Sequence, residues 1–161
     1  MTHLNPGAAI PDFSLACDTG ETVTPATLLG RPAVIYFYPE DDSGGCVDEN
    51  VEFSALLAEF VDRGADLIGV SPDDLASHAR FRAKYNLLPK LGADPDRTMI
   101  EAFGLWQLKK LYGREFMGLI RTSFIIDANG KIGRIIRATR IKGHAAKMLS
   151  ALDEMLAANG Q

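Results

Sequence analysis

The chain has 161 residues, 47% of them hydrophobic, and a formal net charge of −4 at pH 7. This length suits one domain that buries about 70% of its unfolded surface, so we expect a single domain over residues 1–161. The acidic balance and scattered basic residues argue against nucleic acid as a partner, the absence of a long apolar run argues against membrane insertion, and two cysteines are too few for a disulfide scaffold.

The start of the chain lacks the basic and apolar regions of a signal peptide. Together with the low cysteine count, this predicts a reducing, cytoplasmic location.

The first predicted element is an N-terminal β-hairpin. Residues 13–16 and 22–24 flank Asp18-Thr19-Gly20, which is a turn signal. Residues 25–29 then predict one helical turn, because Thr24 is a favourable N-cap and proline is tolerated at the first helical position.

The next segment joins a buried strand to an amphipathic helix and places a cysteine between them. Residues 33–38 are almost all β-branched or aromatic and end at Pro39, which predicts a buried strand. Apolar residues then recur at helical spacing over residues 47–61. Cys46 therefore falls in the first helical turn, where unpaired N–H groups and the helix dipole favour an anion. Because the thiolate is the nucleophilic form of cysteine, we expect the chemistry here.

A second strand and helix follow. Residues 66–70 predict a buried strand, and residues 71–74 (Ser-Pro-Asp-Asp) predict a capping box with proline at the first helical position. The helix is expected to end near Tyr85. Its predicted inward face carries Leu75, Ala79, the stem of Arg82 and Tyr85.

The remaining elements are shorter up to the last helix. Residues 86–92 predict a loop with a short strand, and Asp94-Pro95-Asp96 caps a helix over residues 97–103. Residues 104–118 are the least regular part, with Tyr112-Gly113 as a turn between two extended arms.

The C-terminal part predicts a second hairpin and a helix. Residues 122–127 and 131–138 flank Asn129-Gly130, a strong hairpin signal. Residues 144–158 show an apolar helical face. A parallel βαβ unit closed by an antiparallel hairpin predicts an α/β protein with a mixed β-sheet flanked by helices. With its N-terminal β-hairpin extension, this order is similar to the thioredoxin-like fold.

Three residues at and just before the start of this helix carry a more specific resemblance. Pro39, Ser43 and Cys46 match the Pro-x-x-x-Thr/Ser-x-x-Cys signature of peroxiredoxins. Residues 36–39 (Tyr-Phe-Tyr-Pro) resemble the peroxiredoxin Q type, also called bacterioferritin comigratory protein. The resemblance extends over nearly the whole chain and includes residues 69–73, 94–96 and 121–127.

The resemblance implies a thiol peroxidase that reduces hydrogen peroxide and organic hydroperoxides. The Cys46 thiolate attacks the peroxide and becomes a sulfenic acid. Arg121 stabilises the thiolate and the leaving oxygen, Ser43 contacts the peroxide and the sulfur, and Pro39 shields the sulfur from water. No metal or organic cofactor is implied. The expected reductant is thioredoxin, glutaredoxin or a small thiol, and the chain is expected to be a monomer or a weak homodimer.

Two departures from the family change the environment of the sulfur. Gly44 stands where this type usually has proline, which predicts a loop that is harder to order. Glu40 replaces a usual lysine, and four neighbouring acids add negative charge that disfavours a thiolate. These are Asp41, Asp42, Asp48 and Glu49.

The third departure concerns the second half of the cycle. The two positions at which this type carries a resolving cysteine correspond to Val51 and Arg82. Neither side chain can form a disulfide. We therefore expect a one-cysteine cycle with an external thiol reductant. Resolution through Cys17, giving an atypical two-cysteine peroxidase, remains an alternative.

Other interpretations stay open at this point. Cys46 and Cys17 are also compatible with small buried hydrophobes, in a non-catalytic binding module of the same fold. A dithiol oxidoreductase would need Cys-x-x-Cys, which Cys46 does not begin. The three histidines lack ligand-like spacing, so no metal site is expected; they are His3, His78 and His144. Four apolar residues fit either the core or an apolar lip near the site: Phe103, Trp106, Phe116 and Met117.

Overall fold

A computed structural model describes residues 2–159 of the chain. The strands are β1 (Leu15–Cys17), β2 (Thr22–Val23), β3 (Ala33–Phe37), β4 (Asp66–Ser71), β5 (Lys90–Ala93), β6 (Trp106–Leu111), β7 (Arg114–Leu119), β8 (Thr122–Ile126) and β9 (Ile132–Arg137). The helices are α1 (Pro25–Leu28), α2 (Gly44–Asp62), α3 (Leu75–Tyr85), α4 (Thr98–Ala102) and α5 (His144–Ala158).

One mixed sheet runs through the protein in the strand order β2-β1-β5-β4-β3-β8-β9. β3, β4 and β5 are parallel neighbours, whereas β8 pairs antiparallel with both β3 and β9, and β1 pairs antiparallel with β5. The helix α2 crosses between β3 and β4, as a parallel βαβ unit requires. This arrangement confirms the predicted thioredoxin-like α/β fold with an N-terminal hairpin.

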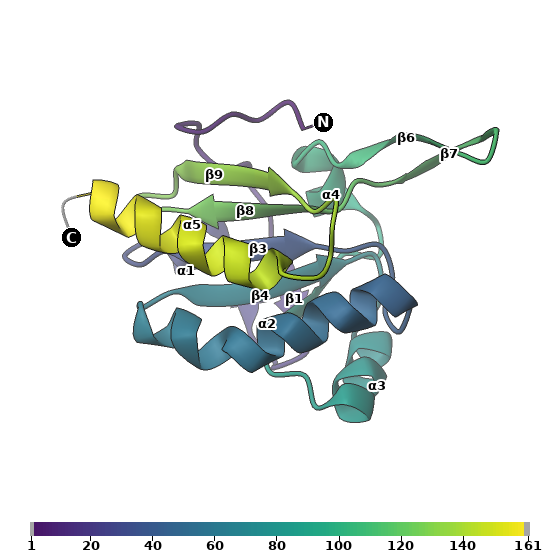
Figure 1. Ribbon diagram of the computed structural model, residues 1–161, viewed down its shortest axis with the longest axis horizontal. Coiled ribbons are helices and arrows are strands. Elements are labelled where there is room, and N and C mark those ends of the chain that lie inside the picture. The colour runs from purple at the N-terminus through teal and green to yellow at the C-terminus, as the bar shows by residue number, and fades with distance from the viewer. Residues whose placement is uncertain (1, 160–161) are drawn as a thin grey trace.

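The sheet separates two apolar cores. Along β3, alternate side chains point to opposite faces: Ile35 and Phe37 join the core that contains α1 and α4, whereas Val34 and Tyr36 join the core beneath α2, α3 and α5. In Figure 1, α2 and α5 lie side by side on the face nearest the viewer. Every residue of β3 is buried, so this strand is the fixed reference for the loop that follows it.

Several local predictions are confirmed. Thr24 caps α1 with a reciprocal capping box to Thr27, and Asp94 accepts hydrogen bonds from two backbone N–H groups in α4. β8 and β9 pair antiparallel across the Asn129-Gly130 turn, where Gly130 has a φ of +77°.

Two predictions are wrong. Helix α3 begins at Leu75 with Asp74 as its N-cap, because Ser71 pairs with Ala93 as the last residue of β4. The buried face of α3 carries His78 and Phe81, and Tyr85 packs against the same core as predicted, while Leu75 and Ala79 are exposed.

The predicted turn at Tyr112-Gly113 between two extended arms is confirmed, and the region 104–118 is more regular than predicted. β6 and β7 form an antiparallel hairpin, which projects from the body of the protein (Figure 1). Its turn residues, Tyr112 and Gly113, both have positive φ, as a tight two-residue hairpin turn requires.

The structure brings several segments to one end of the sheet. The beginnings of α2 and α5 lie at this end, together with the base of the β6–β7 hairpin (Figure 1). Among the described residues, no helix combines the length and apolar character needed to cross a bilayer.

Candidate active site

Cys46 is the third residue of α2 and its side chain is fully buried. The six-residue connection from β3 carries Pro39 and ends at Ser43, which is the N-cap of α2 in an extended conformation. Asp42 has a φ of +59°, so the chain turns sharply just before the helix. The first turn of α2 therefore presents Cys46 at the positive end of a 19-residue helix.

A buried hydrogen-bond chain ties this turn to β3. The hydroxyl of Tyr36 donates to Asn50 (2.7 Å), and the amide of Asn50 donates to the carbonyl of Cys46 (2.9 Å). The ring of Tyr36 stacks on Phe53 with a centroid separation of 4.1 Å. A Cβ on Gly69, opposite Tyr36 on β4, would lie 2.7 Å from that ring, so glycine makes room for it. These contacts hold the backbone of Cys46 in one place.

Arg121 reaches the sulfur from the segment before β8. Its Nη2 lies 3.2 Å from Sγ of Cys46, and its Nη1 lies 2.5 Å from Oε1 of Glu49. The planar guanidinium thus spans the two side chains with different nitrogens. The guanidinium passes close to Gly45, where a Cβ would lie in ordinary van der Waals contact with Nη2, at 3.5 Å. The structure brings Cys46 and Arg121 together, although 75 residues separate them in sequence.

Glu49 is the only one of the four neighbouring acids that meets the guanidinium of Arg121. Burial raises the pKa of Glu49 to about 7, against the opposing effect of Arg121. Its second oxygen, Oε2, is buried without a hydrogen-bond partner among the described residues. A protonated carboxyl suits that position better than a carboxylate. Glu49 therefore titrates beside the sulfur near neutral pH.

This shift predicts how stability depends on pH. A carboxyl whose pKa is raised by folding binds its proton more tightly in the folded chain. The protein therefore loses stability as the pH rises from 4.5 to about 7. Between pH 5 and pH 8 the parent should lose about 2–3 kcal/mol relative to Glu49→Gln. Urea unfolding of both proteins at the two pH values measures the difference. Glu154→Gln, at an exposed glutamate, is the matched control and should track the parent; equal pH dependence for Glu49→Gln and the parent would contradict the assignment.

The Ser43 hydroxyl lies in the same loop but is turned away from the helix. It donates to the carbonyl of Glu40 (3.2 Å) and makes no capping bond to α2. Pro39 directly follows Tyr38 and is partly exposed. Ser43 and Pro39 therefore border the start of α2. The side chain that contacts the sulfur is that of Arg121.

The loop is held on its other side by a buried charge pair. Oδ2 of Asp41 lies 2.7 Å from Nδ1 of His78 on α3, and Nε2 of His78 lies 2.9 Å from the carbonyl of Gly92. Because both ring nitrogens face acceptors, both must donate, and His78 is an imidazolium. Asp41 also accepts from the hydroxyls of Tyr38 and Ser77.

The pKa values of the pair agree with this assignment. Burial alone lowers the pKa of His78, but its hydrogen bond and charge interaction with Asp41 reverse this and raise it. Burial likewise acts to raise the pKa of Asp41, and the bonds from His78, Ser77 and Tyr38 lower it. Asp41 and His78 thus form an ion pair that fixes the loop against α3.

The prediction of negative charge gathered around the sulfur is therefore wrong for two of the five acids. Asp41 pairs with His78, and Asp42 pairs with Lys84 and the hydroxyl of Tyr85. Since both carboxylates are directed toward α3, the loop is acidic in sequence while the site itself faces Arg121 and Glu49.

Cys17 lies far from this site in the fold. It belongs to β1 and to the core on the opposite face of the sheet from Cys46. Two strands, β5 and β4, separate β1 from β3. Burial raises the pKa of the Cys17 thiol to about 11, so it is protonated at neutral pH.

Of the four apolar residues that fit either the core or an apolar lip, Phe103 and Trp106 pack in or against the core, and Phe116 and Met117 do not. Phe103 is fully buried and packs against Phe37 and Phe124, so it belongs to the core. Phe116 and Met117 are exposed on the β6–β7 hairpin.

Sequence reasoning missed the supporting roles of Glu49, Asn50 and His78. Glu49 and Asn50 follow Cys46 by three and four residues, a spacing that places all three on one side of a helix. That signal was present in the sequence. The partnership of His78 with Asp41 depends on where α3 packs, so no local pattern reveals it.

Comparison with known proteins gives one consistent result. The model of the AhpC/TSA family matches residues 6–135. The chain is 39% identical over 149 residues to Peroxiredoxin Bcp of Bacillus subtilis, covering 92% of this chain and 95% of the relative, and 32% identical over 154 residues to Peroxiredoxin Bcp of Escherichia coli, covering 96% and 99%. A structure of the Xanthomonas campestris bacterioferritin comigratory protein, described for its alkyl peroxide reduction activity, superposes with a TM-score of 0.85 at 34% identity, covering 96% of this chain and 98% of that one.

Proposed function

The chain belongs to the AhpC/TSA family and is a peroxiredoxin, a thiol peroxidase. We propose that Cys46 is the residue whose sulfur attacks the peroxide. The observation that carries the proposal is the 3.2 Å contact between Arg121 Nη2 and Cys46 Sγ at the start of α2. A permanent cation and a helix N-terminus converge there on one thiol, which is the environment of a reactive cysteine.

The reaction begins with attack of the thiolate on the terminal oxygen of a hydroperoxide. The S–O bond forms while the O–O bond breaks, Cys46 becomes a sulfenic acid, and the leaving alkoxide or hydroxide takes a proton from water. Negative charge moves from sulfur to the leaving oxygen. Arg121 is positioned to stabilise both, because its guanidinium cannot lose its proton at working pH.

Ser43 and Pro39 are proposed to shape the approach of the peroxide. Rotation of the Ser43 hydroxyl away from the Glu40 carbonyl frees a donor for the peroxide oxygen, and Pro39 limits the access of water to the loop. The relative from Xanthomonas campestris is described as reducing alkyl peroxides, which supports organic hydroperoxides as substrates beside hydrogen peroxide.

The sulfenic acid is proposed to be resolved by an external thiol. A disulfide needs Cα atoms within about 7 Å, whereas three strand spacings of ~4.8 Å separate β1 from β3. Val51 is exposed on α2. The Arg82 guanidinium donates to both carboxylate oxygens of Asp18 and to the carbonyls of Leu87 and Pro89. Arg82, which occupies the second resolving position, therefore holds the loop after α3.

The one-cysteine cycle predicts that Cys17→Ser keeps the parental peroxidase activity. The buried Cys17 thiol lies on the opposite face of the sheet from Cys46, so its removal takes nothing from the cycle. Peroxide consumption with a fixed thiol reductant measures turnover, and Cys46→Ser is the inactive reference. Loss of turnover in Cys17→Ser, with an unchanged unfolding midpoint, would make the enzyme an atypical two-cysteine peroxidase.

Ser43→Ala is expected to slow peroxide oxidation of Cys46 about tenfold. Alkylation of Cys46 by iodoacetamide should stay near the parental rate, because the hydroxyl orients the peroxide and does not generate the thiolate. Stopped-flow oxidation and alkylation, measured side by side, give the two rates. An equal loss in both reactions would assign Ser43 to the folding of the loop or to the state of the thiol.

A further inference from the structure

The basic residues are not scattered in the last third of the chain. Between Asp127 and Asp153 there are six basic residues and no acidic one, although the net charge of the whole chain is −4. They are Lys131, Arg134, Arg137, Arg140, Lys142 and Lys147. The sequence-based prediction of scattered basic charge is therefore wrong for this stretch.

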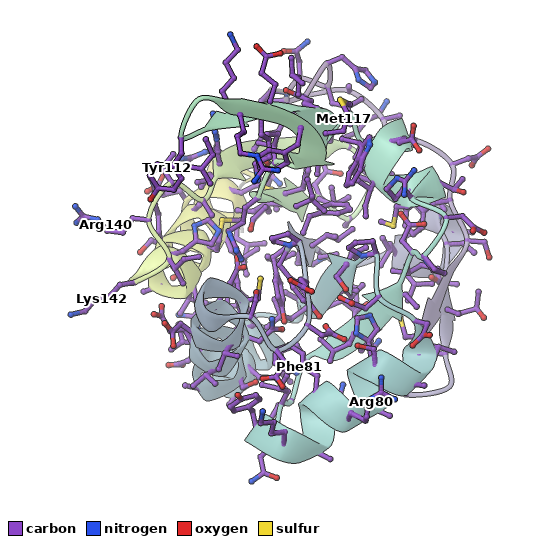
Figure 2. All side chains as sticks on the ribbon, turned by 90° about the vertical axis from the view of Figure 1, so that its right-hand side faces the viewer. Arg80, Phe81, Tyr112, Met117, Arg140 and Lys142 are labelled. Carbon is purple, nitrogen blue, oxygen red and sulfur yellow. The ribbon has the colours of Figure 1, made fainter. Side chains whose placement is uncertain are left out.

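The fold gathers four of these residues around one depression of about 150 Å³. Arg137 ends β9, Arg140 and Lys142 lie on the connection to α5, and Lys147 lies in the first turns of α5. All four are exposed, and none forms an ion pair with a carboxylate of residues 2–159. Figure 2 shows Arg140 and Lys142 projecting from one side of this end of the molecule. We call these four residues the basic surface.

The basic surface borders the candidate active site. The side chain of Ile141, between Arg140 and Lys142, reaches within 3.5 Å of the position that a Cβ of Gly45 would take. The backbone N–H of Ala138 donates to the carbonyl of Arg121 (2.9 Å). The neighbours of Cys46 and Arg121 thus belong to the same rim as the four cations.

Two acidic side chains lie near these cations, Glu49 beside Arg121 and Glu52 at the start of α5. Oε1 of Glu52 accepts from the backbone N–H of Gly143 (3.0 Å), so the start of α5 already has an anionic partner. The positive charges near the site also lower the pKa of the buried His144. Its pKa falls to about 4, first through burial and then through the charges of Lys147 and Arg121.

We propose that the basic surface binds the carboxylates of a small acidic thiol, which reduces the Cys46 sulfenic acid. The inference rests on the proposed function and names its reductant by chemical class. A small thiol is favoured over a protein because Cys46 is fully buried within the first turn of α2. A slim ligand needs a smaller opening of the loop to reach such a sulfur than a protein cysteine does.

Reduction of the sulfenic acid takes two steps. The thiolate of the ligand attacks the sulfenic sulfur, an S–S bond forms, and the hydroxyl leaves as water after taking one proton. A second thiolate then attacks the sulfur of the bound ligand, the Cys46 thiolate leaves, and a ligand disulfide is released. Two thiols supply the two electrons that reduce one hydroperoxide to an alcohol and water.

The test compares two double variants with the same change in net charge. Arg140→Gln/Lys142→Gln removes half of the basic surface, and Arg80→Gln/Lys131→Gln is the matched control, with Arg80 on α3 (Figure 2). Each protein is oxidised with one equivalent of hydrogen peroxide. It is then mixed with mercaptosuccinate, 3-mercaptopropionate or 2-mercaptoethanol at pH 7 and low salt, and quenched mass spectrometry follows the mixed disulfide.

We expect the variant of the basic surface to react about fivefold more slowly with mercaptosuccinate, about twofold more slowly with 3-mercaptopropionate, and at the parental rate with neutral 2-mercaptoethanol. Adding 0.5 M salt to the parent should remove its preference for the dianion. A uniform loss with all three thiols, or no loss with any, would overturn the proposal. A loss confined to reduction by thioredoxin would instead assign the surface to a protein. Oxidation by peroxide, measured first in each protein, tests the proposed function separately.

Discussion

Replacing Arg121 with alanine is expected to lower the rate constant for oxidation of Cys46 by hydrogen peroxide about 10²–10³-fold, which corresponds to about 3–4 kcal/mol of transition-state stabilisation. The guanidinium contacts Sγ at 3.2 Å and is the only cation that does so among the described residues. Without it, negative charge on the sulfur and on the leaving oxygen depends on the helix terminus alone.

Arg121→Lys separates charge from geometry. Lysine keeps the positive charge but cannot bridge Glu49 and Cys46 with two nitrogens in one plane, so we expect a rate between those of the parent and Arg121→Ala. Arg134→Ala, at an exposed arginine paired with Glu154, is the control and should react at the parental rate. Stopped-flow oxidation at equal peroxide concentration measures all four proteins. Parental rates in both Arg121 variants would show that the arginine has no role in the chemistry.

The largest expected effect on stability comes from His78. Its side chain is fully buried and pairs with Asp41, whose side chain is 4% exposed. In His78→Leu the Asp41 carboxylate stays buried without its cation, and removal of one partner from a buried pair costs about 3–5 kcal/mol. Peroxide oxidation should also slow, because the pair fixes the loop that leads to Cys46.

The pH dependence of this pair has a definite sign. His78 has a raised pKa, so its contribution is complete below pH 6.5 and is lost as the pH rises through the folded value. Asp41 has a lowered pKa, so its contribution is complete above pH 3.8 and is lost as the pH falls through the folded value. The ion pair therefore stabilises the protein most between these limits.

Urea unfolding at pH 5.5 measures the effect, with Asp41→Asn and the double variant completing a cycle. The double variant should be less destabilised than the sum of the single variants. Lys84→Ala breaks the neighbouring exposed pair with Asp42 and should leave stability nearly unchanged. Additive losses in the cycle would contradict a direct His78–Asp41 interaction.

The predictable parts of this protein are those encoded in contiguous patterns. The apolar run of β3, the helical spacing in α2 and the Asn129-Gly130 turn each carry their own signal, and the structure agrees with them. The beginning of α3 was mispredicted because Ser71 satisfies a capping pattern, while pairing with Ala93 on β5 keeps it in the sheet. That tertiary pairing has no local signature.

In the site, too, only the features encoded in a local sequence pattern were predictable. The spacing of Pro39, Ser43 and Cys46 is visible in the sequence, and the resemblance singled out Arg121. The directions of the acidic side chains were not predictable, because Asp41 and Asp42 find partners on α3 only after the parallel strands bring that helix beside the loop. Charge counted along the chain overstated the negative potential at the sulfur.

The intact mass of the protein after one equivalent of hydrogen peroxide tests whether Cys46 is the sulfur that attacks the peroxide. We expect rapid gain of one oxygen atom, located at Cys46 by peptide mapping, and complete recovery of the parental mass after addition of a small thiol. Cys17→Ser should give the same result. An unreacted Cys46 would contradict the peroxidase site, and loss of two hydrogens through a Cys17–Cys46 disulfide would contradict the one-cysteine cycle.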